Sequence, residues 1–167
     1  LGQPTPLERH TPASALVLVR GERAFLGGAP GEVIELAGST LAASRKHVLD
    51  SRPIGRLAGD ASGDWIAYAH QERVYLRHRV ADGSYVATPL SFACPSEVIS
   101  LEVGPGGAWV AAVGGYRVDE KSAPPSGYLE VRDAQGNLRW KRDLPPRPEV
   151  VALAHGQLLV GMTIGGL

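Results

Sequence analysis

The segment DASGDWIAYA at Asp60–Ala69 has a counterpart 44 residues later, GPGGAWVAAV at Gly104–Val113. In both, a tight turn leads into an apolar run that starts at tryptophan and alternates small with larger residues. Such runs favour strands buried on both faces, where alanine and glycine let a neighbouring sheet approach closely. Two further runs, Ala24–Gly28 and Leu158–Met162, have the same character. The four runs begin at residues 24, 65, 109 and 158, and these intervals of 41, 44 and 49 residues predict a repeated unit.

Each run is expected to be the second strand of its unit. The preceding strands are predicted at residues 16–19, 54–58, 98–103 and 150–153, and the third strands at residues 33–36, 74–79 and 128–133. A fourth strand is predicted at residues 85–90 and 138–143, after turns in which Gly83 and Gly136 can supply a positive φ. The best helical candidate is the short segment Ser39–Asp50, which Pro53 stops. Four antiparallel strands in a unit of ~40 to 45 residues are the pattern of a β-propeller blade.

The turns and strands also resemble known repeats. Asp60–Ala67 and Gly104–Ala111 resemble the Ser-Pro-Asp-Gly turn and following strand of WD40 repeats. Tyr128–Trp140 is similar both to the end of a WD40 repeat and to the quinoprotein-like repeat, which closes on Gly-x-x-x-Trp. The Trp-Asp pair that names the WD40 family is missing, since Arg132–Asp133 keeps only the aspartate. The resemblance implies an all-β fold built from β-propeller blades of four antiparallel strands, and a small β-sandwich is the alternative.

We expect about three and a half blades, with approximate bounds of 13–50, 51–95, 96–148 and 149–167. Residues 1–12, which contain three prolines, are expected to form an N-terminal linker or arm. Propellers typically close with ~4 to 8 blades, because only a complete ring protects the edges of the sheets. We therefore expect missing sequence or another chain to complete the ring.

The composition excludes several classes of protein. Seventeen Lys+Arg residues balance 17 Asp+Glu residues, and 44% of the chain is hydrophobic. That fraction is too high for a disordered polymer, and a net charge of zero lacks the basic excess that would steer the chain to nucleic acid or an acidic membrane. The longest nearly apolar runs, 108–116 and 150–160, reach about half of the ~20 residues that a membrane span requires. The single cysteine, Cys94, cannot form an internal disulfide and favours a reducing compartment, so we expect a cytoplasmic protein.

The motifs of catalysis and cofactor binding are missing from the sequence. It contains no Gly-x-Ser-x-Gly elbow, no Gly-x-x-x-x-Gly-Lys-Ser/Thr loop and no His-x₃-His pair. Quinone-binding members of the quinoprotein-like family use adjacent cysteines and a calcium site, so a chain with one cysteine is expected to bind no such cofactor. We therefore predict no catalytic, cofactor-binding or metal-binding residue. All five histidines are expected at solvated or blade-edge positions: His10, His47, His70, His78 and His155.

Basic residues surround Trp140. Strand alternation puts Arg139 and Lys141 on one face, opposite Leu138, Trp140 and Arg142. Asp143 interrupts the positive charge. This pattern favours a solvated strand face over a nucleic-acid site. The tryptophan itself is expected to pack between blades.

An enzymatic propeller is the alternative function, and whether the chain belongs to an enzyme stays open. Its catalytic groups would line the central channel and lie mostly in the missing blades. On the innermost strands of this chain the available polar residues are chiefly Ser100 and Glu102.

The insertion Tyr116–Gly127 interrupts the hairpin between the second and third strands of the third unit, so it must project from one rim of the propeller. Either it is a variable loop or it contacts a partner, and in the second case the contact residues are Tyr116, Arg117, Asp119, Glu120 and Lys121. We expect a non-catalytic scaffold for protein-protein interaction, with a sensor or regulatory role in a larger bacterial protein or complex. Its partner would be the rest of the propeller, an attached effector domain or a second chain, and not nucleic acid or membrane.

Overall fold

The computed structural model describes residues 15–19, 23–28, 30–37, 42–86, 89–115, 127–145 and 148–162. Apart from one short 3₁₀ turn, η1 (Pro105–Gly107), every element in these residues is a β-strand. No helix in the described part of the chain has the length and hydropathy needed to cross a membrane.

The described strands form four antiparallel sheets, each built from strands that are consecutive in the chain. Blade 1 consists of β1 (Ala15–Val19), β2 (Arg23–Gly27), β3 (Glu32–Ala37) and β4 (Ala42–Val48). Blade 2 consists of β5 (Arg56–Gly59), β6 (Trp65–His70), β7 (Arg73–His78) and β8 (Leu90–Ala93). Blade 3 consists of β9 (Val98–Val103), β10 (Trp109–Gly115), β11 (Gly127–Asp133) and β12 (Leu138–Leu144). Half-blade 4 consists of β13 (Pro148–Ala154) and β14 (Gln157–Met162).

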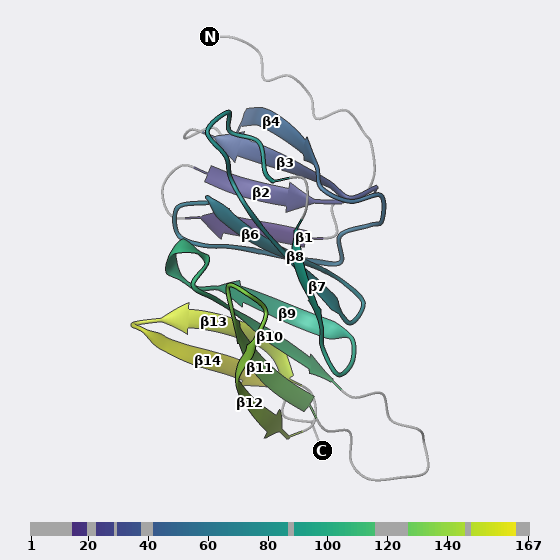
Figure 1. The fold of residues 1–167 in the computed structure, drawn as a ribbon, viewed down its shortest axis with the longest axis vertical. Helices are drawn as coiled ribbons and strands as arrows, with labels where there is room; N and C mark the ends of the chain where they lie inside the picture. Colours follow the sequence, from purple (N-terminus) through teal and green to yellow (C-terminus); the bar gives the residue numbers. More distant parts are fainter. Residues whose placement is uncertain are drawn as a thin grey trace.

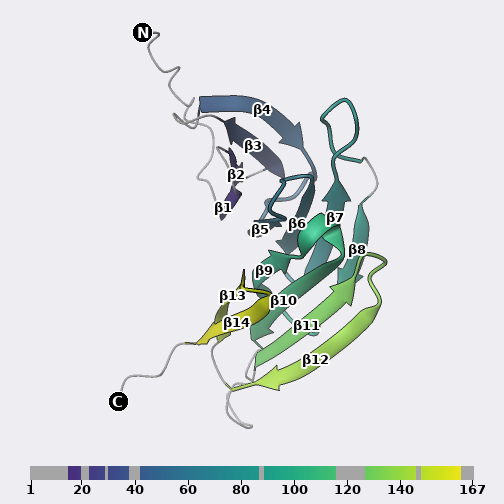
Figure 2. The same ribbon diagram turned by 90° about the vertical axis from the view of Figure 1, so that its left-hand side faces the viewer.

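The sheets follow one another along an arc, from blade 1 at the top of Figure 1 to half-blade 4 near the bottom. Figure 2 shows the first strand of each sheet on the concave side and the fourth strands of the complete blades on the convex side. The first strands contact one another in sequence, β1 with β5, β5 with β9 and β9 with β13. This radial arrangement is that of propeller blades, three complete and one half, as the repeat predicts. It excludes the β-sandwich, in which two sheets pack as layers.

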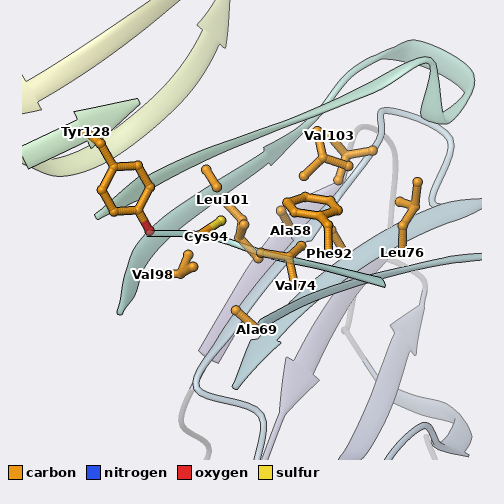
Figure 3. Packing of buried hydrophobic residues seen from close by; sticks show 13 residues of the cluster. Ala58, Ala69, Val74, Leu76, Phe92, Cys94, Val98, Leu101, Val103 and Tyr128 are labelled. Atoms are coloured by element: carbon orange, nitrogen blue, oxygen red, sulfur yellow. The ribbon is translucent and has the colours of Figure 1, made fainter. Parts of the chain in front are cut away.

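Side chains fill the space between each pair of neighbouring sheets. Ile66 and Tyr68 of β6 pack toward blade 1, whereas Ala67 and Ala69 of the same strand pack toward blade 3. The strand is therefore buried on both faces, as its run of small and large residues predicts. Figure 3 shows the cluster between blades 2 and 3, where Phe92 packs among aliphatic side chains from both sheets. A third cluster joins blade 3 to half-blade 4.

The turns follow from their sequences. Gly83 and Gly136 have φ values of +81° and +84°, which confirms the positive φ expected at both positions. In the turn before β6, the carboxylate of Asp60 accepts a hydrogen bond from the Trp65 backbone N–H at 3.1 Å. The same carboxylate accepts a bond from the Gly106 N–H at 3.2 Å, so this turn also ties blade 2 to blade 3.

Two expectations are wrong, one about a helix and one about the start of a fourth strand. The best helical candidate contains a strand, β4, which pairs with β3 from Glu32 to Ala37. In blade 2 the fourth strand begins at Leu90 instead of Tyr85, and Tyr85 forms only an isolated bridge with Arg79. Both differences have a tertiary cause. A neighbouring strand supplies the hydrogen bonds for β4, and the buried Tyr85 ring belongs to the core between blades 1 and 2.

Candidate functional site

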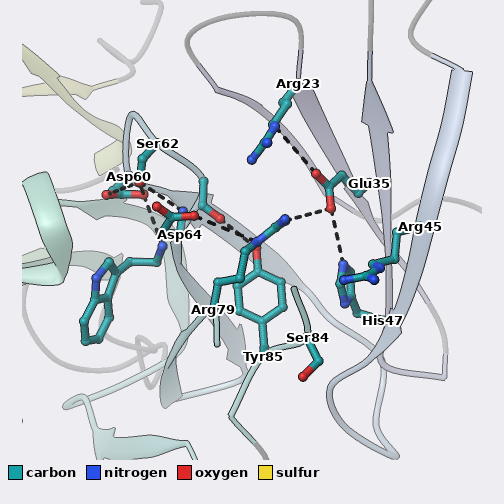
Figure 4. Close-up of polar contacts among 12 residues, drawn as sticks. Arg23, Glu35, Arg45, His47, Asp60, Ser62, Asp64, Arg79, Ser84 and Tyr85 are labelled. Atoms are coloured by element: carbon teal, nitrogen blue, oxygen red, sulfur yellow. Dashed lines mark hydrogen bonds and ion pairs between the residues drawn. The ribbon is translucent and has the colours of Figure 1, made fainter. Parts of the chain in front are cut away.

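A charged cluster lies buried between blades 1 and 2 (Figure 4). Its centre is Glu35 on β3, a residue that is only 5% exposed. One carboxylate oxygen, Oε2, accepts a hydrogen bond from the Arg79 guanidinium at 2.7 Å and lies 3.4 Å from His47 Nε2. The other oxygen, Oε1, forms an ion pair with Arg23 Nε at 3.7 Å. Tyr85 completes what we call the Glu35 cluster, because its ring packs edge-on against His47 and under the Arg79 guanidinium.

The charge state of the Glu35 cluster follows from these contacts. Burial favours a neutral Glu35, but the hydrogen bonds and charges of its partners, Arg79 first, hold the pKa of the carboxyl below its ordinary value. Burial lowers the pKa of His47 despite its hydrogen bond to the carboxylate. At neutral pH the carboxylate is therefore ionised and the imidazole uncharged. Since a carboxylate only accepts hydrogen bonds, His47 donates from its Nε2–H.

The Glu35 cluster lies between blades 1 and 2, at a position where the interface between blades 2 and 3 has an apolar contact. Glu35 pairs with Phe25 across the β2–β3 ladder in the same way that Leu76 pairs with Ala67 and Val131 pairs with Ala111. The position that is a carboxylate in blade 1 is thus leucine or valine in blades 2 and 3. Both carboxylate oxygens have cationic or hydrogen-bonding partners from this chain, so the cluster joins two blades.

The innermost strands hold the polar residues that an enzymatic propeller would use. Ser100 on β9 accepts a hydrogen bond from the Val151 backbone N–H at 3.1 Å. Burial raises the pKa of Glu102, two residues further along, to about 7. The Ser100 hydroxyl therefore joins blade 3 to half-blade 4.

The described residues were searched for a metal site, and the environment of the single cysteine was compared with that of a reactive thiol. Within them, no group of three or more His, Cys, Asp or Glu side chains is placed to hold a metal ion. Cys94 is buried in the core between blades 2 and 3, and this burial raises the pKa of its thiol to about 12. The thiol is therefore protonated and shielded at neutral pH.

An apolar groove lies between the outer part of blade 3 and half-blade 4. Its volume is about 360 Å³, and its walls include Trp109, Leu129, Val131, Trp140 and Leu158. The side chain of Trp140 on β12 is 45% exposed there. The tryptophan thus faces half-blade 4 as expected for packing between blades, but the described strands cover it only in part.

On its opposite face, half-blade 4 exposes a second apolar surface. Leu159 is 53% exposed and Val150 is 47% exposed, and both point away from blade 3 because their neighbours Val151, Leu158 and Val160 point toward it. Leu159 and Val150 thus lie exposed on the face of half-blade 4 that is turned away from blade 3.

The structure confirms the alternation predicted for β12 from Trp140 to Arg142, whereas Leu138, expected on the same face as Trp140, pairs with Arg132 beyond a β-bulge. Its residues are exposed up to Asp143, and the ammonium of Lys141 lies 3.9 Å from the Glu130 carboxylate on the face toward blade 2. Trp140 lies on the other face, in the groove. Arg142 shares that face, because it pairs with the groove residue Leu129 across the β11–β12 ladder.

Sequence reasoning missed the buried charges between the blades. His47, expected at a solvated or blade-edge position, is 7% exposed and belongs to the Glu35 cluster. Arg77 is also 7% exposed, and its guanidinium donates hydrogen bonds to the backbone carbonyl oxygens of Leu49 and Val86. The only signal in the sequence was a carboxylate at a strand position that other repeats fill with leucine or valine.

The predicted contact residues Tyr116, Arg117, Asp119, Glu120 and Lys121, like the N-terminal arm, lie outside the described residues.

No protein-family model matches the sequence, and no curated protein matches it. Its fold, however, is similar to that of solved propellers. The RRP9 WD40 repeats align with a TM-score of 0.58 at 12% identity, over 86% of this chain and 42% of that structure. The Cps50 (Swd1) β-propeller domain of Myceliophteria thermophila aligns with a TM-score of 0.57 at 15% identity, over 92% of this chain and 64% of that structure.

Hydrazine synthase of Kuenenia stuttgartiensis aligns with a TM-score of 0.56 at 11% identity, over 83% of this chain and 39% of that structure. The chain therefore spans between 39% and 64% of the length of these three structures. At such identities the similarity concerns the fold alone. The described blades form part of a WD40-like β-propeller.

Proposed function

We propose that these blades act as a non-catalytic scaffold for protein recognition within a larger protein or complex. The observation that carries the proposal is the apolar groove beside half-blade 4, with a tryptophan almost half exposed in it. Tryptophan is among the residues that most often dominate the binding energy of protein interfaces. The charged residues described so far pair within the chain or lie on solvated strands, a pattern that supports a rigid frame more than a reactive centre.

The proposal extends to setting. We propose a sensor or regulatory role in a bacterial cytoplasmic protein. The single, buried Cys94 supports only the compartment, because a free cysteine suits a reducing one. The insertion Tyr116–Gly127 is proposed as a second contact with a protein partner, since loops at the rim of a propeller can vary without disturbing the blades.

The test is to compare the native mass of the protein, isolated from the cells that make it, with its mass under denaturing conditions. We expect the native mass to include a second polypeptide. Substitution Trp140→Glu should release that polypeptide, because a carboxylate in the groove loses its hydration when the groove is covered. The matched control is Val48→Glu, at an exposed valine of blade 1 that is 71% exposed. A wild-type native mass of 17.6 kDa, that of these 167 residues alone, would contradict the proposal, as would equal release by both variants.

A further inference from the structure

The interface between blades 1 and 2 contains a buried histidine. His47 on β4 is 7% exposed, and its Nε2–H donates to the Glu35 carboxylate at 3.4 Å. Across the interface, the Tyr85 ring packs against the imidazole, with 5.0 Å between the ring centres. Histidine is the side chain whose charge ordinarily changes between about pH 5 and pH 8. A change of charge at His47 would therefore occur inside the contact between two blades.

Blade 1 holds residues 79–86 of blade 2 through this region. The Arg79 guanidinium donates to Glu35 at 2.7 Å, and Arg45 Nη1 donates to the carbonyl oxygen of Asp82 at 3.0 Å. Arg45 and His47 are two residues apart on β4, so their side chains share the face turned to blade 2. The imidazole is thus part of one continuous contact between β4 and residues 79–86.

The charged side chains around the imidazole are mostly cations. Among the described residues, the charged and titratable groups that face the ring or the carboxylate beside it are Glu35 on β3, Arg23 on β2, Arg45 on β4, and Arg79 and Tyr85 of blade 2. Asp64 lies 4.0 Å from Arg79 but is 58% exposed, and Asp82 is an exposed neighbour of Arg45. A proton on the imidazole would add a cation to a buried set in which three arginines already surround one carboxylate.

The Glu35 carboxylate compensates only part of that charge. Its Oε2 already accepts the Arg79 guanidinium, and its Oε1 forms the ion pair with Arg23. Figure 4 shows Arg79 and His47 reaching the same carboxylate oxygen. Burial, together with the charges of Arg79 and Arg45, holds the pKa of His47 below its ordinary value. The imidazole is therefore easier to protonate when the interface is open than when it is closed.

We propose that His47 makes the interface between blades 1 and 2 sensitive to pH, because protonation of its imidazole loosens blade 1 from residues 79–86. The proton comes from solvent and adds to Nδ1, since Nε2 already carries the hydrogen donated to Glu35. The neutral imidazole stabilises the closed interface above about pH 6.5, and this stabilisation is lost as the pH falls from there through the lower folded-state pKa. Glu35 stays ionised over this range, because its pKa also lies below its ordinary value.

The interface between blades 2 and 3 supplies an internal reference. Phe92 pairs with Val74 as His47 pairs with Val33, so a phenylalanine occupies the equivalent position there. Its ring carries no charge at any pH. Glu102, whose pKa burial raises to about 7, lies on the face of blade 3 turned to half-blade 4, and its effect on stability has the opposite sign. The loss of stability in acid should therefore be confined to the interface between blades 1 and 2.

The experiment measures amide hydrogen exchange of the native protein at pH 7.5 and pH 5.5, with any chain that completes it still bound. Rates are corrected for the intrinsic pH dependence of exchange, so that protection reports the opening of each strand. We expect the protection of β3 and of residues 79–86 to fall roughly 3- to 10-fold at pH 5.5, and that of β10 and β11 not to fall. Exchange of the imidazole C2 hydrogen gives the pKa of His47 itself, expected below about 6.5.

Two substitutions remove the titrating group. His47→Gln keeps an N–H donor for Glu35 but carries no charge, and His47→Phe reproduces the residue found in blade 2. Both should abolish the fall in protection at pH 5.5. The matched control is His78→Gln, at an exposed histidine of blade 2, which should leave that fall unchanged.

Three results would overturn the inference. The first is an equal fall in β10 and β11, which means that acid opens all the blades together. The second is a fall that persists in His47→Gln. The third is a pKa of His47 at or above about 6.5 in the wild type, a measurement that decides the question even where both variants fail to fold. The proposed function is tested by the native mass and does not depend on these outcomes.

Discussion

The substitution Arg79→Leu tests whether the Glu35 cluster joins blades 1 and 2. It removes the cation that donates to Glu35 Oε2 at 2.7 Å and leaves a carboxylate whose side chain is 6% exposed. Removing one partner of a buried ion pair typically costs about 3–5 kcal/mol. We expect the lower end, ~3 kcal/mol, because Arg23 and His47 remain near the carboxylate and the Arg79 side chain is itself 15% exposed.

The assay is thermal and urea unfolding at pH 7, followed by tryptophan fluorescence. For a domain of this size, ~3 kcal/mol corresponds to a fall in Tm of roughly 6–12 °C. The loss should shrink as the pH is lowered. In the wild type the pKa of Glu35 lies below its ordinary value, so the carboxylate stabilises the fold above that value and the gain is lost as the pH falls through the folded-state pKa. In the variant, burial without Arg79 raises the pKa, and protonation relieves the unpaired charge.

A second substitution set separates charge from packing. Adding Glu35→Leu and His47→Phe to Arg79→Leu reproduces the side chains found at the equivalent positions of blade 2, Leu76 and Phe92. Most of the lost stability should return, because a buried ion pair and a well-packed apolar contact of similar volume are often equivalent. A loss below about 1 kcal/mol for Arg79→Leu at pH 7, or the same loss at pH 4, would refute the description of Glu35 as an ionised, buried carboxylate.

Three further predictions concern single residues. Because burial raises the pKa of Glu102 to about 7, the wild type should lose stability as the pH rises from 4.5 through 7, and Glu102→Gln should remove this dependence in urea titrations across that range. Cys94, whose pKa burial raises to about 12, should react with an aromatic disulfide reagent at pH 8 only as fast as the protein unfolds, and rapid labelling of the native protein would contradict this. Gly107→Ala should cost ~1–3 kcal/mol more than Gly106→Ala, since both glycines have positive φ but only the first would bring a Cβ to 2.2 Å from the Trp65 ring; equal unfolding free energies would exclude the clash.

Much of the fold could be predicted because hairpins are local. The turn that contains Gly136 and the strand that starts at Leu138 lie within a few residues of each other, so their sequence carries the signal. The fourth strands of blades 1 and 2 were harder. In β4 three small residues are followed by three basic ones without alternation, and its strand conformation depends on the edge of β3. Tyr85 has strand propensity, yet its ring is drawn into the core between two blades.

The candidate site was predictable only in part. The alternation along β12 indicated that Trp140 and Arg142 share a face. It could not indicate that this face borders a groove, because the groove requires half-blade 4 to lie beside blade 3. The Glu35 cluster was missed for a similar reason. Glu35 and Arg79 are separated by 44 residues in the chain, and nothing in the local sequence links one to the other.

The sequence by itself determined the repeat, the order of the strands within a blade and the apolar character of the second strands. These properties depend on side-chain periodicity and turn residues, which act over a few positions. Tertiary structure alone decided which charges are buried and which apolar residues stay exposed. His47 is buried because blade 2 covers it, whereas Trp140 is half exposed because half-blade 4 covers only part of blade 3. Whether a side chain on the face of a blade is buried or exposed depends on the neighbouring sheet, which comes from a distant part of the chain.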